Sequence, residues 1–127
     1  MTDLLEAEVR RHHDDLAAWL GSEADPEVLA TFEAMHRPEF SLVTIEGRTL
    51  DLPTLTRALA GARNAVPGMT IGIEEFEVVI RTADASVVRF LERHSPTSLR
   101  RVTAVLVPDE GARHGVRWLS VHETPVA

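Results

Sequence analysis

The chain has 127 residues, no cysteine and a formal net charge of −7, and 44% of its residues are hydrophobic. This length predicts one domain, residues 1–127, that folds without a metal or a disulfide. The missing cysteines exclude thiol catalysis and zinc–thiolate sites. The negative charge disfavours nucleic acid and anionic membranes as partners, and no apolar run approaches the ~20 residues of a membrane span. With an acidic start that lacks the basic region of a signal peptide, we expect a cytoplasmic protein.

Two helices are predicted before the first strand. Asp3 caps the first helix, which ends at Gly21. The second begins at Asp25-Pro26-Glu27, a cap followed by proline at the first helical position, and it ends before Pro38. His12 falls on the apolar stripe of the first helix. That stripe has the helical spacing of Leu5, Val9, Leu16, Trp19 and Leu20.

The middle of the chain predicts a strand, a turn and a third helix. Residues 40–45 are rich in strand-forming side chains, and Glu46-Gly47 is a turn signal after them. Residues 48–50 return as a short partner strand. Asp51 then caps a helix that ends at Val66-Pro67-Gly68.

Four further strands are predicted over residues 70–81, 86–94, 99–107 and 116–123. In the first of them the apolar period slips, which predicts a β-bulge near Glu74-Glu75 and a bend in the sheet. Connections such as Ala83-Asp84 and Ser95-Pro96-Thr97-Ser98 are short, so we expect an antiparallel meander. The two middle strands are apolar on both faces, so we expect the helices on one face and a second subunit on the other.

The local sequence resembles a known group of proteins. The segment Glu39-Phe40-Ser41-Leu42-Val43, with Glu46-Gly47-Arg48 after it, resembles the strand–turn segment of the SnoaL-like group in the nuclear transport factor 2-like superfamily. Residues 101–106 and 118–124 resemble its closing hairpin. The resemblance spans nearly the whole chain. It implies an α+β fold, a cone in which three helices pack on a strongly bent antiparallel or mixed sheet.

The resemblance implies a ligand in the open end of the cone and a homodimer through the outer sheet face. The superfamily includes ketosteroid isomerases, polyketide cyclases, dehydratases and transport adaptors, so the fold does not settle the function. The isomerases use a tyrosine donor, and this chain has no tyrosine. We expect a pocket that binds a small apolar molecule, with no cofactor and no assigned catalysis. The alternative is a cofactor-free acid–base isomerase, cyclase or dehydratase acting on a hydrophobic or polyketide-like substrate.

The last strand carries the first group of candidate site residues. Trp118, Ser120 and His122 alternate along it and are expected to share one face. On a concave face they supply a stacking ring, a hydroxyl group and a base that titrates near neutral pH. His122 is then the catalytic proton carrier. In the alternative, Trp118 is a core residue and His122 forms a hydrogen bond at the end of the sheet.

Three further candidates lie elsewhere in the chain. His12 is a second catalytic candidate, with a buried structural histidine as the alternative. Arg89 and Arg101 interrupt apolar strands, and each is expected to bind a ligand carboxylate or enolate or to pair with a glutamate across the sheet. The run His12-His13-Asp14-Asp15 contains metal-binding residue types. Its side chains point ~100° apart on a helix, so we expect no metal site there.

Overall fold

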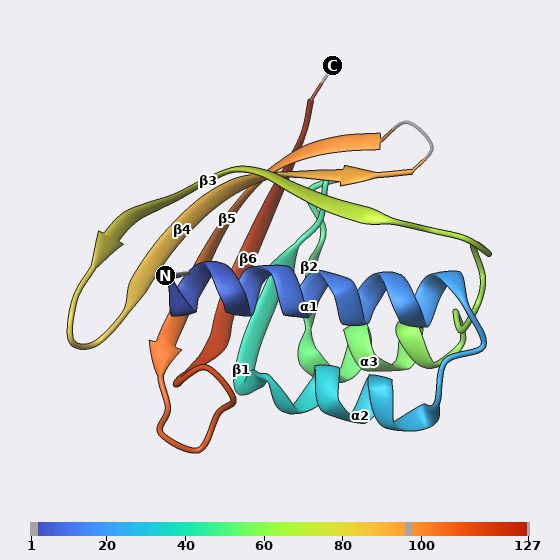
Figure 1. Ribbon diagram of the computed structural model, residues 1–127, viewed down its shortest axis with the longest axis horizontal. Helices are drawn as coiled ribbons and strands as arrows, with labels where there is room; N and C mark the ends of the chain where they lie inside the picture. Colours follow the sequence, from blue (N-terminus) through green and yellow to red (C-terminus); the bar gives the residue numbers. More distant parts are fainter. Residues whose placement is uncertain (1–2, 96–97, 127) are drawn as a thin grey trace.

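Three helices lie on one side of a curved six-stranded sheet (Figure 1), in a computed structural model that describes residues 3–95 and 98–126. The helices are α1 (Leu4–Gly21), α2 (Pro26–Ala34) and α3 (Leu52–Ala60). The strands are β1 (His36–Val43), β2 (Thr49–Asp51), β3 (Ile71–Arg81), β4 (Ser86–His94), β5 (Ser98–Pro108) and β6 (Val116–Pro125). This arrangement confirms the expected α+β cone. None of the helices described is long and apolar enough to cross a membrane.

The three predicted helix caps are confirmed. The side chain of Asp3 accepts a hydrogen bond from the backbone N–H of Leu5 at 2.7 Å. Asp25 and Asp51 cap α2 and α3 in the same way, with donor–acceptor distances of 2.8 and 2.9 Å. Each cap satisfies one of the amide groups that a helix N-terminus leaves without a partner inside the helix.

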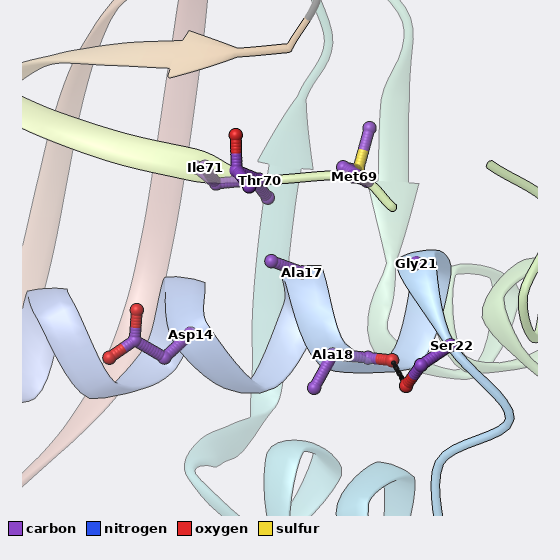
Figure 2. Close-up of a pocket in the computed structure, with 8 residues that line it drawn as sticks. All are labelled: Asp14, Ala17, Ala18, Gly21, Ser22, Met69, Thr70 and Ile71. Carbon is purple, nitrogen blue, oxygen red and sulfur yellow. Dashed lines mark hydrogen bonds between the residues drawn. The ribbon is translucent and has the colours of Figure 1, made fainter. Parts of the chain in front are cut away.

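The third helix ends earlier than predicted, because the segment after it returns to α1. Backbone N–H groups of residues 64, 66 and 68 donate to the carbonyls of residues 19, 20 and 21 at the end of α1, at 2.8–2.9 Å. Gly21 allows a close approach here, since a Cβ at this position would lie 2.8 Å from the backbone nitrogen of Met69. Figure 2 shows residues 69–71 passing over Ala17 and Gly21, where they form an open surface groove.

The sheet is a meander with one parallel pair. Its strand order is β2-β1-β6-β5-β4-β3, and β1 runs parallel to β6, whereas all other neighbours are antiparallel. β1 begins at His36, four residues before the predicted start. Its pairing with β6 is interrupted between His36 and Ser41. Pro38 lies in this interruption. Proline has no N–H group to donate to a neighbouring strand, and at this point of β1 the pairing does not require one. The predicted turn at residues 95–98 includes residues 96 and 97, which lie outside the described part.

The predicted bulge in β3 is confirmed. The pairing with β4 jumps between Glu74 and Glu77, and Glu75 has a φ of 51°. Because a bulge bends its strand, β3 curves over α1 instead of continuing flat (Figure 1). A second shift follows between Val78 and Ile80. Both shifts contribute to the curvature of the sheet.

The buried apolar side chains form two clusters. The larger joins the start of α1 to the inner sheet face, with Phe90 and Trp118 at its centre. The smaller lies among the three helices, around Trp19, Phe32 and Leu59. The functional candidates lie between these clusters.

Candidate functional site

A cavity of about 220 Å³ lies between the two apolar clusters. Its wall is mostly apolar and combines side chains from the three helices with side chains from β1 and β6, namely Leu16, Leu20, Phe32, Phe40, Leu42, Leu55, Leu59 and Val121. Polar side chains complete the lining: His12, His13, His36, Glu92, His94, Arg100 and Glu123. The arrangement is that of a small-molecule site, apolar with a few convergent polar groups.

Glu92 on β4 is buried between two histidines. One carboxylate oxygen lies 3.2 Å from Nε2 of His13, and the other accepts a hydrogen bond from Nε2 of His94. His13 Nδ1 lies 2.7 Å from the carbonyl oxygen of Val9. Both ring nitrogens of His13 therefore face acceptors, so its ring donates from both and carries a positive charge.

The titration of this pair follows from the same contacts. Burial lowers the pKa of His13, but the charge and hydrogen bond of Glu92 outweigh burial and raise the pKa above its ordinary value. Burial raises the pKa of Glu92, and the charge of His13 with the hydrogen bonds of both histidines brings it well below its usual range. The pair is thus ionised around neutral pH.

Glu123 and Arg100 lie beside this pair on the neighbouring strands β6 and β5. Burial, and next the charge of Glu92, raise the pKa of Glu123 above its ordinary value. Arg100 holds it weakly, because Nη1 lies 3.4 Å from both carboxylate oxygens. Glu123 is therefore the carboxyl group of the cavity that most readily keeps a proton.

His12 and His36 form a second buried pair. Their Nε2 atoms lie 3.0 Å apart, and His36 Nδ1 lies 3.3 Å from the carbonyl oxygen of Glu33 at the end of α2. Burial lowers the pKa of His36 to about 4. Burial, followed by the proximity of His36 and His13, lowers the pKa of His12 well below its ordinary value. Both rings are neutral at pH 7.

A buried carboxylate, that of Glu8, is linked to this pair through Trp118. Glu8 on α1 is fully buried, and it accepts a hydrogen bond from Trp118 Nε1 at 2.8 Å. Arg113 donates to both of its oxygens at 2.9 and 3.0 Å, and His114 Nδ1 lies 2.8 Å from one of them. Trp118 in turn stacks on His12, with ring centroids 4.0 Å apart.

The pKa of Glu8 reflects these contacts. Burial raises it, and the hydrogen bonds of Arg113, His114 and Trp118 together bring it below its ordinary value. Glu8 is therefore an ionised anchor behind the cavity, and the loop between β5 and β6 is tied through it to α1.

The structure separates the residues that the sequence placed together on the last strand. Trp118 is fully buried and packs behind His12, whereas Ser120 is partly exposed and His122 is exposed. The pairing of β5 with β6 shifts between Val105 and Leu106, which leaves Leu119 as an extra residue. The expected shared face is therefore wrong, because a bulge turns His122 outward and brings Glu123 inward.

The two predicted arginines lie outside the cavity. Arg89 pairs with Glu77 at 3.0 Å, and Arg101 lies 3.7 Å from Glu75. Both side chains are about two-fifths exposed. These contacts correspond to the alternative in which the arginines pair across the sheet. The arginine that lines the cavity is Arg100, one position earlier than Arg101.

Sequence reasoning missed most of the polar lining. Glu92 and His94 follow Val88 and Phe90 with the same parity, so a strict alternation along β4 places both on the inner face. Glu8 stands between Leu5 and His12 on the buried stripe of α1. An acidic residue on an apolar stripe signals a buried partner.

Comparisons with known proteins identify the fold. No family model matches the sequence, and no curated protein does. A solved NTF2-like protein of unknown function from Pseudomonas aeruginosa superimposes with a TM-score of 0.91, at 23% identity over 98% of this chain and 100% of that chain. This likeness confirms the nuclear transport factor 2-like fold of the chain. The SnoaL-like group remains a resemblance of the sequence.

Two further solved structures share the fold at lower similarity. A candidate ketosteroid isomerase from Parabacteroides distasonis has a TM-score of 0.69 and 13% identity, over 98% of this chain and 89% of that chain. A CaMKII hub from S. rosetta has a TM-score of 0.67 and 15% identity, over 97% and 92%. These proteins carry different functions on one fold, so the function must be argued from the site.

We predict that His36 makes the folded state sensitive to mild acid. Its pKa is about 4 when folded and 6.5 ordinarily, so between these values the unfolded chain binds a proton that the folded chain does not. The free energy of unfolding should fall as the pH decreases from 6.5 to 4, by up to about 3 kcal/mol. Urea unfolding of the wild type and of His36→Gln at pH 7 and pH 5 measures this.

His36→Gln should lose less stability than the wild type over this pH step, even if it is less stable at pH 7. The exposed His122 supplies the matched control, because His122→Gln should keep the wild-type pH dependence. Equal pH dependence in the wild type and His36→Gln would contradict the prediction.

Proposed function

We propose that this protein binds a small, largely apolar molecule in the cone cavity. The observation that carries the proposal is the cavity itself, an apolar space of about 220 Å³ that ends in charged and hydrogen-bonding groups. Apolar cavities of about 150 Å³ in other proteins hold benzene. A cavity of this size therefore suits a molecule of one ring or two fused rings.

The polar end gives such a ligand an orientation. Arg100 has a buried Nε with no hydrogen-bond partner in residues 3–95 and 98–126, and its Nη1 makes only the long contacts to Glu123. Buried polar groups are normally paired. A ligand oxygen at this end finds a donor in the guanidinium group of Arg100, while its apolar part lies against the leucines of α1 and α3.

Indene, a hydrocarbon of two fused rings, is the probe for the first test. It should bind with a Kd of about 1 mM or tighter, detected as shifts of leucine methyl signals in NMR titrations. Leu55→Trp should abolish binding, because Leu55 lines the cavity and the larger ring fills it. Leu4→Trp is the matched control, since Leu4 is 62% exposed.

Shifts confined to the methyl groups of the lining leucines place the probe in the cavity. The proposal fails if indene causes no saturable shift, or if Leu4→Trp and Leu55→Trp weaken its binding equally. Far-UV circular dichroism of both variants would verify that each retains its helices and strands.

Acid–base catalysis is a second candidate, favoured by the contact between Glu92 and His94. The carboxylate accepts the hydrogen of His94 Nε2, so a neutral His94 presents Nδ1 with a free electron pair. A carboxylate that orients a histidine in this way is a recurring arrangement around general bases. We infer that His94 and Glu123 exchange protons with the ligand, in place of the exposed His122.

In the simplest reaction, His94 removes a proton from the carbon next to a ketone while Glu123 gives its proton to the ketone oxygen. The proton on His94 exchanges with solvent, the enol carbon takes a proton back from His94, and the enol oxygen returns its proton to Glu123. In D2O this exchanges the α-hydrogens of 1-indanone for deuterium. We predict that the wild type accelerates this exchange, which NMR measures, and that His94→Asn lowers the acceleration by roughly 10²-fold. His122→Asn should leave it unchanged. A wild-type rate equal to buffer alone would exclude this candidate.

We also infer a homodimer that covers the outer face of the sheet. Ile80 is 53% exposed on this face, and Val87 and Val105 lie there partly exposed on the neighbouring strands. Arg89 and Glu77 form an ion pair on the same face. A second copy of the chain buries Ile80, Val87 and Val105 at the centre of the interface. It also places charged side chains opposite Arg89 and Glu77, as in a typical interface with a hydrophobic centre and a polar rim.

Light scattering after size-exclusion chromatography tests this dimer. The wild type should have twice the mass of one chain, and Val105→Glu should have the mass of one chain, because a charge at the centre of the interface is left without a partner. Val66→Glu is the control, since Val66 is exposed in the loop after α3. A monomeric wild type, or a dimeric Val105→Glu, would refute the interface.

A further inference from the structure

Arg100 is held only loosely by its partner on the neighbouring strand. Its Nη1 lies 3.4 Å from each carboxylate oxygen of Glu123, and its Nη2 donates to Ser98 Oγ at 3.2 Å. Charge-assisted hydrogen bonds of arginine are usually about 2.7–2.9 Å long. The pair of Arg113 and Glu8 in this chain is close to that range, at 2.9 and 3.0 Å. The guanidinium group of Arg100 therefore has capacity for a better-placed acceptor.

The pair of Arg100 and Glu123 has the most surface left for a ligand among the polar groups of the cavity lining. Both residues line the cavity, and their side chains are 17% and 13% exposed. The other polar residues of the lining are less exposed. Arg100 shares the parity of the buried Val102, and Glu123 shares that of Val121, so both side chains project from the inner face of the sheet.

The charges of the lining favour an anion at this place. Among the described residues that line the cavity, His13 and Arg100 are cations around neutral pH, and Glu92 is an anion. Glu123 balances the second cation, but burial, and next the charge of Glu92, raise its pKa. An arginine keeps its proton, whereas a glutamate can take one. Glu123 is therefore the group whose charge can adjust when another anion enters.

We propose that the ligand of the cavity is a carboxylate with an apolar ring, and that Arg100 binds it together with Glu123, which takes up one proton from the solvent as the ligand binds. This inference rests on the proposed binding function and names the class of ligand. Arg100 Nη1 and the hydroxyl group of the protonated Glu123 both donate to the carboxylate of the ligand. The total charge in the cavity is then the same before and after binding, so no unpaired charge is buried.

The affinity for such a ligand depends on pH. The charged and titratable groups that face Glu123 are His13 from α1, Glu92 and His94 from β4, and Arg100 from β5. His13 and Glu92 keep each other ionised, which leaves Glu123 to take the proton. Because the complex holds one proton more than the free protein, the affinity should rise as the pH falls from 8 to 7, by up to about tenfold. The affinity for a neutral ligand should stay constant.

Indene-2-carboxylate and indene-2-carboxamide test the inference, because they have nearly the same shape and only the first is an anion. At pH 7 the carboxylate should bind the wild type at least about tenfold more tightly, as measured by isothermal titration calorimetry. Titrations in two buffers of different ionisation enthalpy should show proton uptake with the carboxylate and none with the carboxamide. Equal affinity for the two probes, or no proton uptake, would overturn the inference. Tighter binding of 2-aminoindane, a cation of similar size, would overturn it too.

Two variants separate the role of Glu123 from that of Arg100. A glutamine donates a hydrogen bond without taking up a proton. Glu123→Gln should therefore bind the carboxylate at pH 8 at least as tightly as the wild type, and without proton uptake. Arg100→Gln should lose the preference for the carboxylate, whereas the matched Arg101→Gln should keep it, since Arg101 lies outside the cavity. Proton uptake that survives in Glu123→Gln would overturn the assignment to Glu123.

The same probes distinguish failure of this inference from failure of the proposed function. Binding of the carboxamide by each variant verifies that its cavity is intact. If indene and the carboxamide bind the wild type and the carboxylate binds no better, the cavity remains an apolar site and the carboxylate inference is overturned. Binding of none of these three probes would instead refute the cavity as a ligand site.

Discussion

Polar side chains separate most of the two apolar clusters of this protein, which both contact Leu55, and the rest of the structure depends on this separation. His12 and His36 are held by one another, and Glu92 by His13 and His94. Each group is buried, so each needs the partner it has. The helices therefore stay apart from the inner sheet face along this row of polar groups. The cavity is the space that the separation leaves.

The C-terminal part of the chain helps to position these buried polar groups. Glu8 joins α1 to Trp118 and to Arg113 on the last loop, and Trp118 packs against His12. Removing one partner of such a buried charge typically costs about 3–5 kcal/mol. A change at Arg113 therefore acts on the position of His12, although the two residues lie about a hundred positions apart in the sequence. The cavity wall and the loop between β5 and β6 are thus linked through Glu8.

The sequence predicted the helices and the sheet well, because their signals are local. Caps such as Asp3 and Asp51 act within a few residues, and the slipped period before Phe76 marked the bulge in β3 correctly. The site was harder to predict because a bulge reverses the facing of every residue after it. The same break of period occurs in β6, where Trp118 and Val121 are both buried, and there it was overlooked. Because of this single shift, Glu123 lines the cavity in the place where His122 was expected. His36 could not be found, since its role depends on the meeting of α1 and α2.

The persistence of the cavity is itself an argument for function. An unfilled apolar space costs about 24 cal/mol per Å³ in other proteins, so 220 Å³ corresponds to as much as about 5 kcal/mol. A domain of this size has a total stability of roughly 5–15 kcal/mol. Larger side chains at positions such as Leu16 and Val121 would fill much of the space and recover part of that energy. A sequence that keeps small apolar walls beside four histidines and two glutamates forgoes this stability. The proposed ligand binding accounts for this choice, whereas packing alone does not.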